Sequence, residues 1–129
     1  MFDQYMICKD DFRNVTDGGA VTGFQIGARL PYYRGLGLSM VEEIAVSVDG
    51  EACPRESVRF GVRGRSWTLD EMEHETDERW EMGEVATVFV KRPGGLPPGE
   101  HRIELMERLR ISYLPFPSIT RDAKTLTLA

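Results

Sequence analysis

The side chains that most often perform acid–base chemistry or bind metals near neutral pH are scarce in this chain. His74 and His101 are its only histidines, with 26 residues between them. A histidine metal site in a β-rich protein would need a close pair such as His-x-His and a third ligand, and no such pair is present. The run from His74 to Glu78 also lacks the second histidine of a metalloprotease helix. We therefore assign no catalytic residue and no metal ligand, although a metal-dependent enzyme using His74 or His101 with neighbouring acids stays open as an alternative.

Nucleophile and phosphate-binding motifs give no stronger signal. Cys8 and Cys53 have no spacing that links them to either histidine as a nucleophile–base pair. Without a secretion signal, two cysteines are expected to be buried or half-buried thiols. The chain has no G-x-S-x-G and no P-loop, and its Gly35-Leu36-Gly37 stands outside the strand–helix context of a dinucleotide fold. No cofactor is expected in this chain.

Four residues have instead the character of a contact surface: Tyr32, Tyr33, Arg34 and Phe116. Tyrosine and arginine are enriched in binding hot spots. Two prolines flank Phe116, and their fixed φ lowers the entropy that this aromatic tip loses on binding. We expect these residues to form part of a substrate pocket or a subunit interface. The alternative, in which the loop 31–38 and Phe116 only pack a corner of the core, stays open.

Short strands are the elements that must position these residues. Alternating apolar and polar residues between glycine-containing turns predict strands over 5–8, 12–16, 20–30, 40–48, 51–53, 58–63, 85–90, 100–114 and 124–128. Asp17-Gly18-Gly19 and Asp49-Gly50 are expected to be tight hairpin turns. Lys9-Asp10-Asp11 is expected to end the first strand, and Gly23 and Gly27 indicate a bulge or a close approach of another backbone.

Two details of this pattern predict local structure. Thr68 followed by Glu71 forms a capping box, so a helix of one or two turns is expected over roughly Leu69 to Glu75. In the strand 100–114, Glu107 interrupts the inward apolar row and indicates a bulge or a change of sheet. The members of that row are Ile103, Leu105, Leu109, Ile111 and Tyr113. The two tryptophans, Trp67 and Trp80, are expected to anchor the core or its corners.

The succession of strands with one short helix predicts an all-β fold, an antiparallel β-sandwich, with a closed barrel as the alternative. At 129 residues the chain is expected to be a single domain spanning 1–129. A parallel sheet is excluded because no strand–helix–strand rhythm occurs.

Charge and hydropathy restrict the partners. The segment 70–84 contains eight acids and one base and so has a net charge of −7. The whole chain has a net charge of −5, so the rest of the chain carries about +2. Clustered Lys and Arg are absent, so nucleic acid is not an expected partner. The apolar runs are too short to cross a membrane. The N-terminal residues have no signal-peptide pattern, which favours a cytoplasmic location.

Several strings give a more specific indication. Residues 5–15 (YMICKDDFRNV), 30–36 (LPYYRGL), 76–81 (TDERWE) and 109–115 (LRISYLP) resemble the small β subunit of bacterial C-glycoside deglycosidases. The resemblance extends over nearly the whole chain and its length. It rests on strings typical of the family rather than on a mechanistic motif, so no catalytic residue is transferred.

The resemblance implies a β-sandwich that assists a larger α subunit similar to sugar-phosphate isomerase TIM barrels. In that family the α subunit binds a divalent metal, typically manganese, and carries the acid–base histidine. The complex cleaves the C–C bond between an aglycone, such as a flavonoid or another aryl group, and a sugar already oxidised to its 3-keto form. The ketone acidifies the proton on C2, so the carbon–carbon lyase reaction is an elimination and not a hydrolysis.

Two functions follow as hypotheses. The first is an accessory subunit, inactive alone, that completes the α-subunit pocket around the 3-keto C-glycoside. The second is a stand-alone carbohydrate- or ligand-binding module in which Tyr32, Tyr33 and Trp67 would be stacking surfaces. A binding module would stay monomeric, whereas an accessory subunit would associate with its partner.

Overall fold

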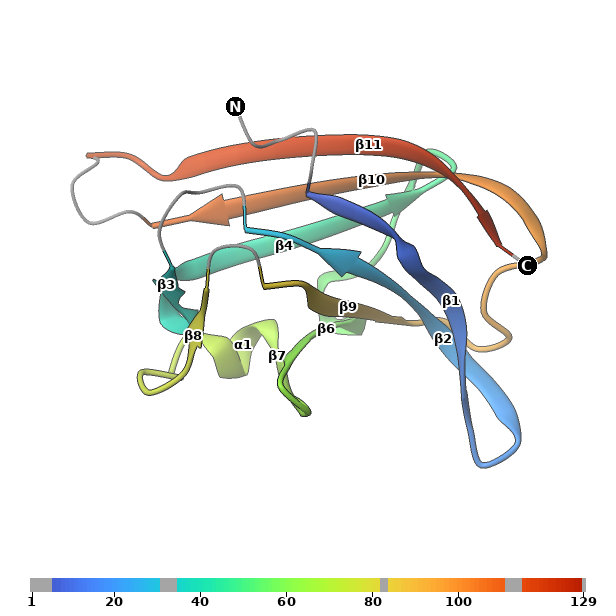
Figure 1. Cartoon of the computed structure of the whole chain (residues 1–129), viewed down its shortest axis with the longest axis horizontal. Helices are drawn as coiled ribbons and strands as arrows, with labels where there is room; N and C mark the ends of the chain where they lie inside the picture. Colours follow the sequence, from blue (N-terminus) through green and yellow to red (C-terminus); the bar gives the residue numbers. More distant parts are fainter. Residues whose placement is uncertain (1–5, 31–34, 82–83, 111–114, 129) are drawn as a thin grey trace.

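The computed structural model describes residues 6–30, 35–81, 84–110 and 115–128. Figure 1 shows two layers of β-strands with one short helix near the lower edge. The strands are β1 (Ile7–Asp17), β2 (Ala20–Ala28), β3 (Leu36–Gly37), β4 (Val41–Val48), β5 (Glu51–Ala52), β6 (Val58–Val62), β7 (Arg65–Thr68), β8 (Arg79–Trp80), β9 (Ala86–Lys91), β10 (Gly99–Leu109) and β11 (Ser118–Leu128). The helix α1 spans Leu69–Met72, and 3₁₀ turns occupy Leu38–Met40 (η2) and Arg55–Ser57 (η3). No helix in these ranges is long and apolar enough to cross a membrane.

The strands form a five-stranded sheet in the order β1-β2-β9-β6-β7 and a four-stranded sheet in the order β11-β10-β4-β5. All their pairings are antiparallel, and β3 pairs separately with β8. The apolar face of each sheet supplies one common core. Phe12 of β1 meets Phe24 of its own sheet edge-on and His101 of the opposite sheet, which joins the two layers. The predicted antiparallel β-sandwich is confirmed.

The first hairpin differs from the expectation in one respect. Lys9-Asp10-Asp11 does not end the strand, because β1 continues through it as a wide bulge. The register passes from Cys8 opposite Gly27 to Arg13 opposite Gln25, so four residues of β1 face a single residue of β2. The bulge is tolerated because it places Phe12 in the core and because Gly27 has no side chain beneath Asp11. The bulge predicted near Gly27 is thereby confirmed, but it lies in β1, and the side chains of Asp11 and Cys8 rather than another backbone approach Gly27.

Gly23 lies under an equally close contact on the other side of β2. A Cβ at this position would collide with the Val90 carbonyl and lie 2.9 Å from the Phe89 ring. We expect Gly23→Ala to lower the free energy of unfolding by about 1–3 kcal/mol, since backbone must move to admit the methyl group. Gly37→Ala is the matched control, because its nearest neighbour would be Ser39 Oγ at 4.0 Å. Denaturant unfolding of both variants tests this; equal midpoints would contradict the contact.

The turns and the helix follow the sequence closely. Gly18 and Gly50 have positive φ in the two predicted hairpins. The Thr68 hydroxyl accepts the Glu71 N–H at 3.1 Å, and the Glu71 carboxylate accepts the Thr68 N–H at 2.8 Å, which is the predicted capping box. The same Thr68 N–H lowers the pKa of Glu71 below its ordinary value. The helix is shorter than expected and ends at Met72.

The last two long strands show the largest difference from the predicted boundaries. β10 ends at Leu109 within the described part of the chain, and the predicted inward residues Ile111 and Tyr113 lie outside it. Glu107 does not leave the inward row but belongs to it, and the register shift against β4 falls one step later, between Arg108 and Leu109. β11 begins at Ser118, six residues before the predicted start at Lys124, because it pairs with the full length of β10.

Candidate functional site

Of the four predicted contact residues, the structure describes one. Tyr32, Tyr33 and Arg34 lie outside the described residues, so their role stays a prediction. Phe116 is 63% exposed in the connection before β11. Its ring therefore lies mostly outside the core of the described residues, and its contact role stays a prediction. An exposed aromatic side chain of this size is suited to contact with a partner.

The described ends of the 31–34 segment are firmly attached to the fold. On one side the Arg29 N–H donates to the Met6 carbonyl at 2.8 Å, and Leu30 is buried. On the other side the Gly35 carbonyl accepts a hydrogen bond of 2.9 Å from the Arg79 guanidinium. Leu36 then pairs with Trp80 in the β3–β8 ladder. The described residues on both sides of 31–34 are thus bonded to other parts of the fold.

Both tryptophans anchor the core, as predicted. Trp80 is fully buried, packs edge-on against Phe60 at 4.9 Å, and donates its Nε1–H to the Glu84 carbonyl at 2.9 Å. Trp67 is also buried and donates to Glu75 at 3.0 Å, with the Arg65 guanidinium over its ring. Because the Trp67 face is already covered, it offers no stacking surface to a sugar, which argues against this part of the binding-module hypothesis.

The acidic segment after α1 is paired with arginines that the sequence pattern did not connect to it. Arg63 contacts Glu78 at 3.2 Å and also binds Glu84, and Arg65 contacts Glu78 at 2.7 Å and Glu75 at 3.7 Å. Exposed pairs of this kind contribute little to stability, because solvent screens their attraction. The sequence signal for these ion pairs is Arg63-Gly64-Arg65, because this turn places two cations on one side of the β6–β7 hairpin.

A polar pocket of about 390 Å³ lies where β4 and β10 approach the segment following α1. Its lining residues are Ser39, Glu42, Arg55, Glu73, His74, Arg108 and Arg110. Most of these charges are used within the chain: Arg108 binds Glu42 at 3.3 Å, and Arg55 binds Glu43 at 2.8 Å. Among the described residues, the Arg110 guanidinium donates to the weak acceptor Met40 Sδ at 3.4 Å. The pocket therefore has room and a guanidinium for a small anionic group.

Neither histidine belongs to a metal-binding group in the part of the chain that the structure describes. Across the described ranges, no three His, Cys, Asp or Glu side chains gather as a metal site would require. His74 is exposed beside Glu73 at the polar pocket. The two cysteines are not joined by a disulfide; Cys53 is half-buried, and burial raises the pKa of its thiol.

His101 has a structural role instead. Its buried ring contacts the Asp49 carboxylate through Nδ1 and the Pro97 carbonyl through Nε2, both at 2.7 Å. Both partners are acceptors, so the ring satisfies both only when it is protonated on both nitrogens. The Pro97 carbonyl and then Asp49 raise the pKa of His101 above its ordinary 6.5, and His101 lowers that of Asp49. The ring thus ties the β4–β5 turn to the start of β10.

We expect this arrangement to make stability depend on pH. The folded-state pKa of His101 is raised, so its contribution is complete below about 6.5 and is lost as pH rises through the folded-state value. Asp49→Asn keeps a residue that tolerates the positive φ of this turn but removes the charge facing the ring. Ring-proton NMR titration should give a lower His101 pKa in the variant, and its unfolding midpoint should vary less above pH 6.5. Identical titrations would contradict the pairing.

Glu107 is the residue whose environment sequence reasoning missed. Its side chain is fully buried on the inner face of β10, and no hydrogen-bond partner for either carboxylate oxygen is found in the described structure. Desolvation alone raises the pKa of this carboxyl well above its ordinary value. A single charged residue in an otherwise apolar alternating row was the available signal, and it indicated a buried acid rather than a departure from the row.

The described residues thus form a β-sandwich with a polar pocket and an exposed aromatic side chain, Phe116. A family model described as C-glycoside deglycosidase beta subunit matches residues 2–113. The C-glycoside deglycosidase beta subunit of Eubacterium cellulosolvens is 35% identical over 105 residues, which cover 81% of this chain and 71% of that protein. The 3'-dehydrocarminate deglycosidase beta subunit of a Microbacterium species is 38% identical over 116 residues, covering 89% and 83%.

The chain belongs to the C-glycoside deglycosidase beta subunit family, as its sequence strings indicated. A third relative, a beta subunit from Arthrobacter globiformis, is 30% identical over 93 residues, covering 71% of this chain and 70% of that protein. The family match reaches through the 31–34 segment and to the end of β10. The predicted contact residues Tyr32, Tyr33 and Arg34 therefore lie within the matched region, whereas Phe116 lies beyond it.

Proposed function

We propose that this chain is the accessory β subunit of an enzyme that cleaves the C–C bond between an aglycone and a 3-keto sugar. The observation that carries the proposal is the family match over residues 2–113, together with three relatives that are named as deglycosidase beta subunits. The name of the Microbacterium relative specifies 3'-dehydrocarminate, which supports a substrate oxidised on its sugar.

In this proposal the chemistry is divided between two subunits. The C2 proton next to the ketone is removed, the bond from C1 to the aglycone breaks, and the aglycone carbon takes up a proton as C1 and C2 become doubly bonded. The acid–base histidine and a divalent metal, manganese in the expected case, belong to a TIM-barrel α subunit. The present chain contributes binding surface and exclusion of water, which strengthens the electrostatic interactions in the site. No catalytic step is assigned to its residues.

The decisive experiment compares three preparations with a 3-keto C-glycoside: this chain alone, the α subunit alone, and both co-expressed. We expect aglycone release only from the co-expressed pair, with both chains eluting together on size exclusion. Release by the isolated chain would overturn the accessory role. A chain that stays monomeric beside the α subunit would favour the stand-alone binding module instead.

The loop 31–38 gives a second test at the level of residues. Tyr33→Ala and Arg34→Ala are expected to weaken assembly or turnover by about tenfold each, which is the loss expected for about 1.4 kcal/mol of contact energy. The isolated variants should retain the unfolding midpoint of the unmodified chain. If complex mass and turnover are unchanged in both variants, this loop has no contact role and the remaining proposal stands on its other surfaces.

A further inference from the structure

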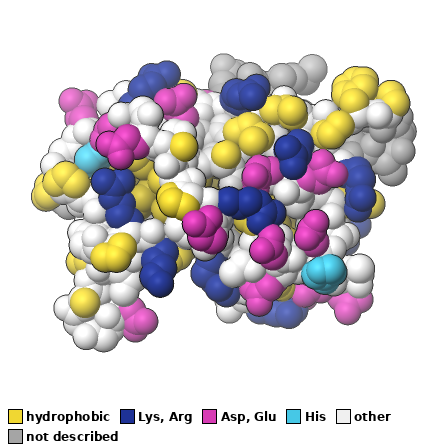
Figure 2. All heavy atoms as spheres, turned by 180° about the vertical axis from the view of Figure 1, so that it is seen from behind, with side chains coloured by type: hydrophobic (Ala, Val, Ile, Leu, Met, Phe, Trp, Pro, Cys, Tyr) yellow, Lys and Arg dark blue, Asp and Glu magenta, His cyan; other side chains and the backbone are white. Residues whose placement is uncertain are grey.

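The outer face of the four-stranded sheet has the composition of a docking surface. Register places its outward residues in three rows across β4, β10 and β11. These rows are Ser47–Glu104–Ala123, Ala45–Met106–Arg121 and Glu43–Arg108–Ile119. Figure 2 shows this face from outside, with yellow apolar side chains lying between blue and magenta charged ones. A centre of small and apolar side chains with charges around it is the usual anatomy of a protein interface.

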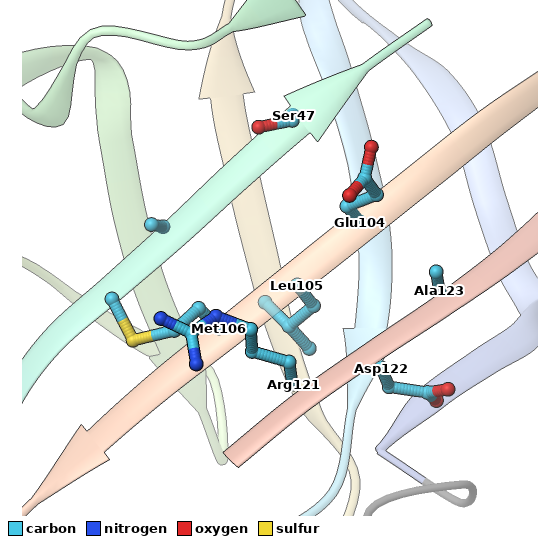
Figure 3. A pocket seen from close by; sticks show the side chains of 8 residues that line it. Ser47, Glu104, Leu105, Met106, Arg121, Asp122 and Ala123 are labelled. Carbon is cyan, nitrogen blue, oxygen red and sulfur yellow. The ribbon is translucent and has the colours of Figure 1, made fainter. Parts of the chain in front are cut away.

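The centre of this face is hollow. A depression of about 250 Å³ is lined by residues from all three strands. Small side chains make the space: Ala45 and Ser47 lie on β4 and Ala123 on β11. Met106 and the Arg121 side chain, which extends across β10, form one margin (Figure 3). Figure 3 shows the short Ser47 and Ala123 side chains on either side of β10. The volume suits a single large apolar side chain that projects from a partner.

Two opposite charges stand beside the hollow. The exposed side chains of Glu104 and Arg121 extend from β10 and β11, as Figure 3 shows. Neither makes an ion pair with any residue in the described ranges. By contrast, other arginines form ion pairs with acidic residues of the chain, namely Arg55, Arg63, Arg65 and Arg108. Unpaired charges at the rim of an apolar surface set the orientation and the association rate of a partner with complementary charges.

The face continues into exposed apolar residues at one end. Ile119, in the row next to Met106 and Arg121, is 50% exposed, and Phe116 just before β11 is 63% exposed. Within the described residues the only other exposed large hydrophobic side chain is Val85, which is less exposed at 39%. Ile119 thus lies at one end of this sheet face, and Phe116 precedes the strand at the same end.

The size of the face is adequate for a stable complex. The 11-residue strands β10 and β11 are about 36 Å long at about 3.3 Å per residue, and three strands are about 14 Å wide. The flat area of about 500 Å², together with projecting side chains and the Phe116 tip, approaches the about 800 Å² that each partner of a standard interface buries.

We propose that this face binds the partner subunit of the same enzyme, through a partner segment that inserts one large apolar side chain into the hollow. A basic group of the partner would lie opposite Glu104 and an acidic group opposite Arg121. A second copy of this chain fits less well, because a two-fold axis through the hollow would place one hollow against another and leave both unfilled. This inference rests on the proposed function, since it names the surface that the β subunit uses for assembly.

Substitutions that fill the hollow test the surface. Ala45→Arg and Ala123→Arg each place a long charged side chain in it, and both positions are exposed, so the fold should tolerate them. Ala20→Arg is the matched control, an exposed alanine at the start of β2 in the other sheet. Binding of each purified, folded variant to the α subunit is measured by interferometry. We expect at least about tenfold weaker binding for the two hollow variants and unchanged binding for the control.

The electrostatic part has its own variant. Arg121→Glu leaves the hollow open but reverses its rim charge, so it should slow association more at low salt than at high salt. If the unmodified chain binds the α subunit and all three face variants bind as tightly, the surface is wrong while the proposed function stands. If the unmodified chain does not bind at all, the proposed function itself fails. If the isolated chain dimerises and Ala45→Arg makes it monomeric, the face joins two copies and the assignment to the partner subunit is overturned.

Discussion

Replacing Trp80 by alanine is expected to lower the free energy of unfolding by about 3–5 kcal/mol, the usual cost of deleting a large buried aromatic side chain. Trp80 is fully buried, and its ring centroid lies 4.9 Å from the ring centroid of Phe60. Its truncation also leaves the Glu84 carbonyl without the indole N–H that it accepts at 2.9 Å. Since domains of this size are stable by about 5–15 kcal/mol, the variant should be close to unfolding at 37 °C.

The loss should extend beyond global stability to the segment with the predicted contact residues. Trp80 pairs with Leu36, and its neighbour Arg79 holds the Gly35 carbonyl, so both interactions fix the C-terminal attachment of residues 31–34. We expect faster hydrogen exchange at Leu36 and Gly37 in Trp80→Ala, measured by mass spectrometry. Trp80→Phe is the control: it keeps most of the buried area, loses the hydrogen bond to Glu84, and should cost clearly less. Equal losses in the two variants would show that the hydrogen bond, not the packing, dominates.

The parts of the fold that the sequence predicted well are those with local physical causes. Positive-φ glycines fix the two hairpin turns, the Thr68–Glu71 capping box fixes the start of α1, and alternation of apolar residues fixes the inner face of β4 and β6. In each case the residues that carry the signal also make the interaction. The helix was predicted too long because acidic residues after Met72 suit a helix but bind arginines of the β6–β7 hairpin instead.

The parts that were missed depend on contacts between distant segments. Over most of β11 exposed residues alternate with partly buried ones, and the partly buried ones are polar, so its buried apolar signal starts only at Leu126. Its full extent is set by β10, which pairs with it along its entire length. The bulge in β1 is likewise invisible in the local pattern, because Lys9-Asp10-Asp11 is compatible with a strand only when Gly27 lies opposite.

The candidate contact surface was predictable only in part. Paired tyrosines with an arginine indicated the 31–34 segment from residue type alone, and two prolines indicated the exposed tip at Phe116. The sheet face with its hollow has no such signal. Ala45 and Ala123 are 78 positions apart in sequence, and only the strand order brings them to either side of β10.

Glu107→Gln is expected to stabilise the chain at neutral pH by about 1–3 kcal/mol, because keeping a proton that the unfolded chain releases costs about 1.4 kcal/mol per pH unit. The carboxyl of Glu107 is fully buried, and desolvation raises its pKa well above 4.5. A raised folded-state pKa means that the folded chain keeps a proton which the unfolded chain releases. Stability is therefore complete below about pH 4.5 and falls as pH rises toward the folded-state pKa. The amide cannot ionise, so the variant lacks this loss.

Denaturant unfolding at several pH values separates the cost of ionising the Glu107 carboxyl from the cost of burying it without a hydrogen-bond partner. The difference between Glu107→Gln and the unmodified chain should be small near pH 4 and grow with pH. Glu107→Leu should be more stable than both over the whole range, because the protonated carboxyl also lacks a described partner. Glu104→Gln, on the exposed face of the same strand, is the control and should show no such pH-dependent gain.

Parallel curves for Glu107→Gln and the unmodified chain would mean that Glu107 is as well solvated in the folded state as in the unfolded one. A stabilised variant that no longer binds the α subunit would instead show that this costly buried acid is retained for assembly, since unfavourable local choices tend to persist at functional sites.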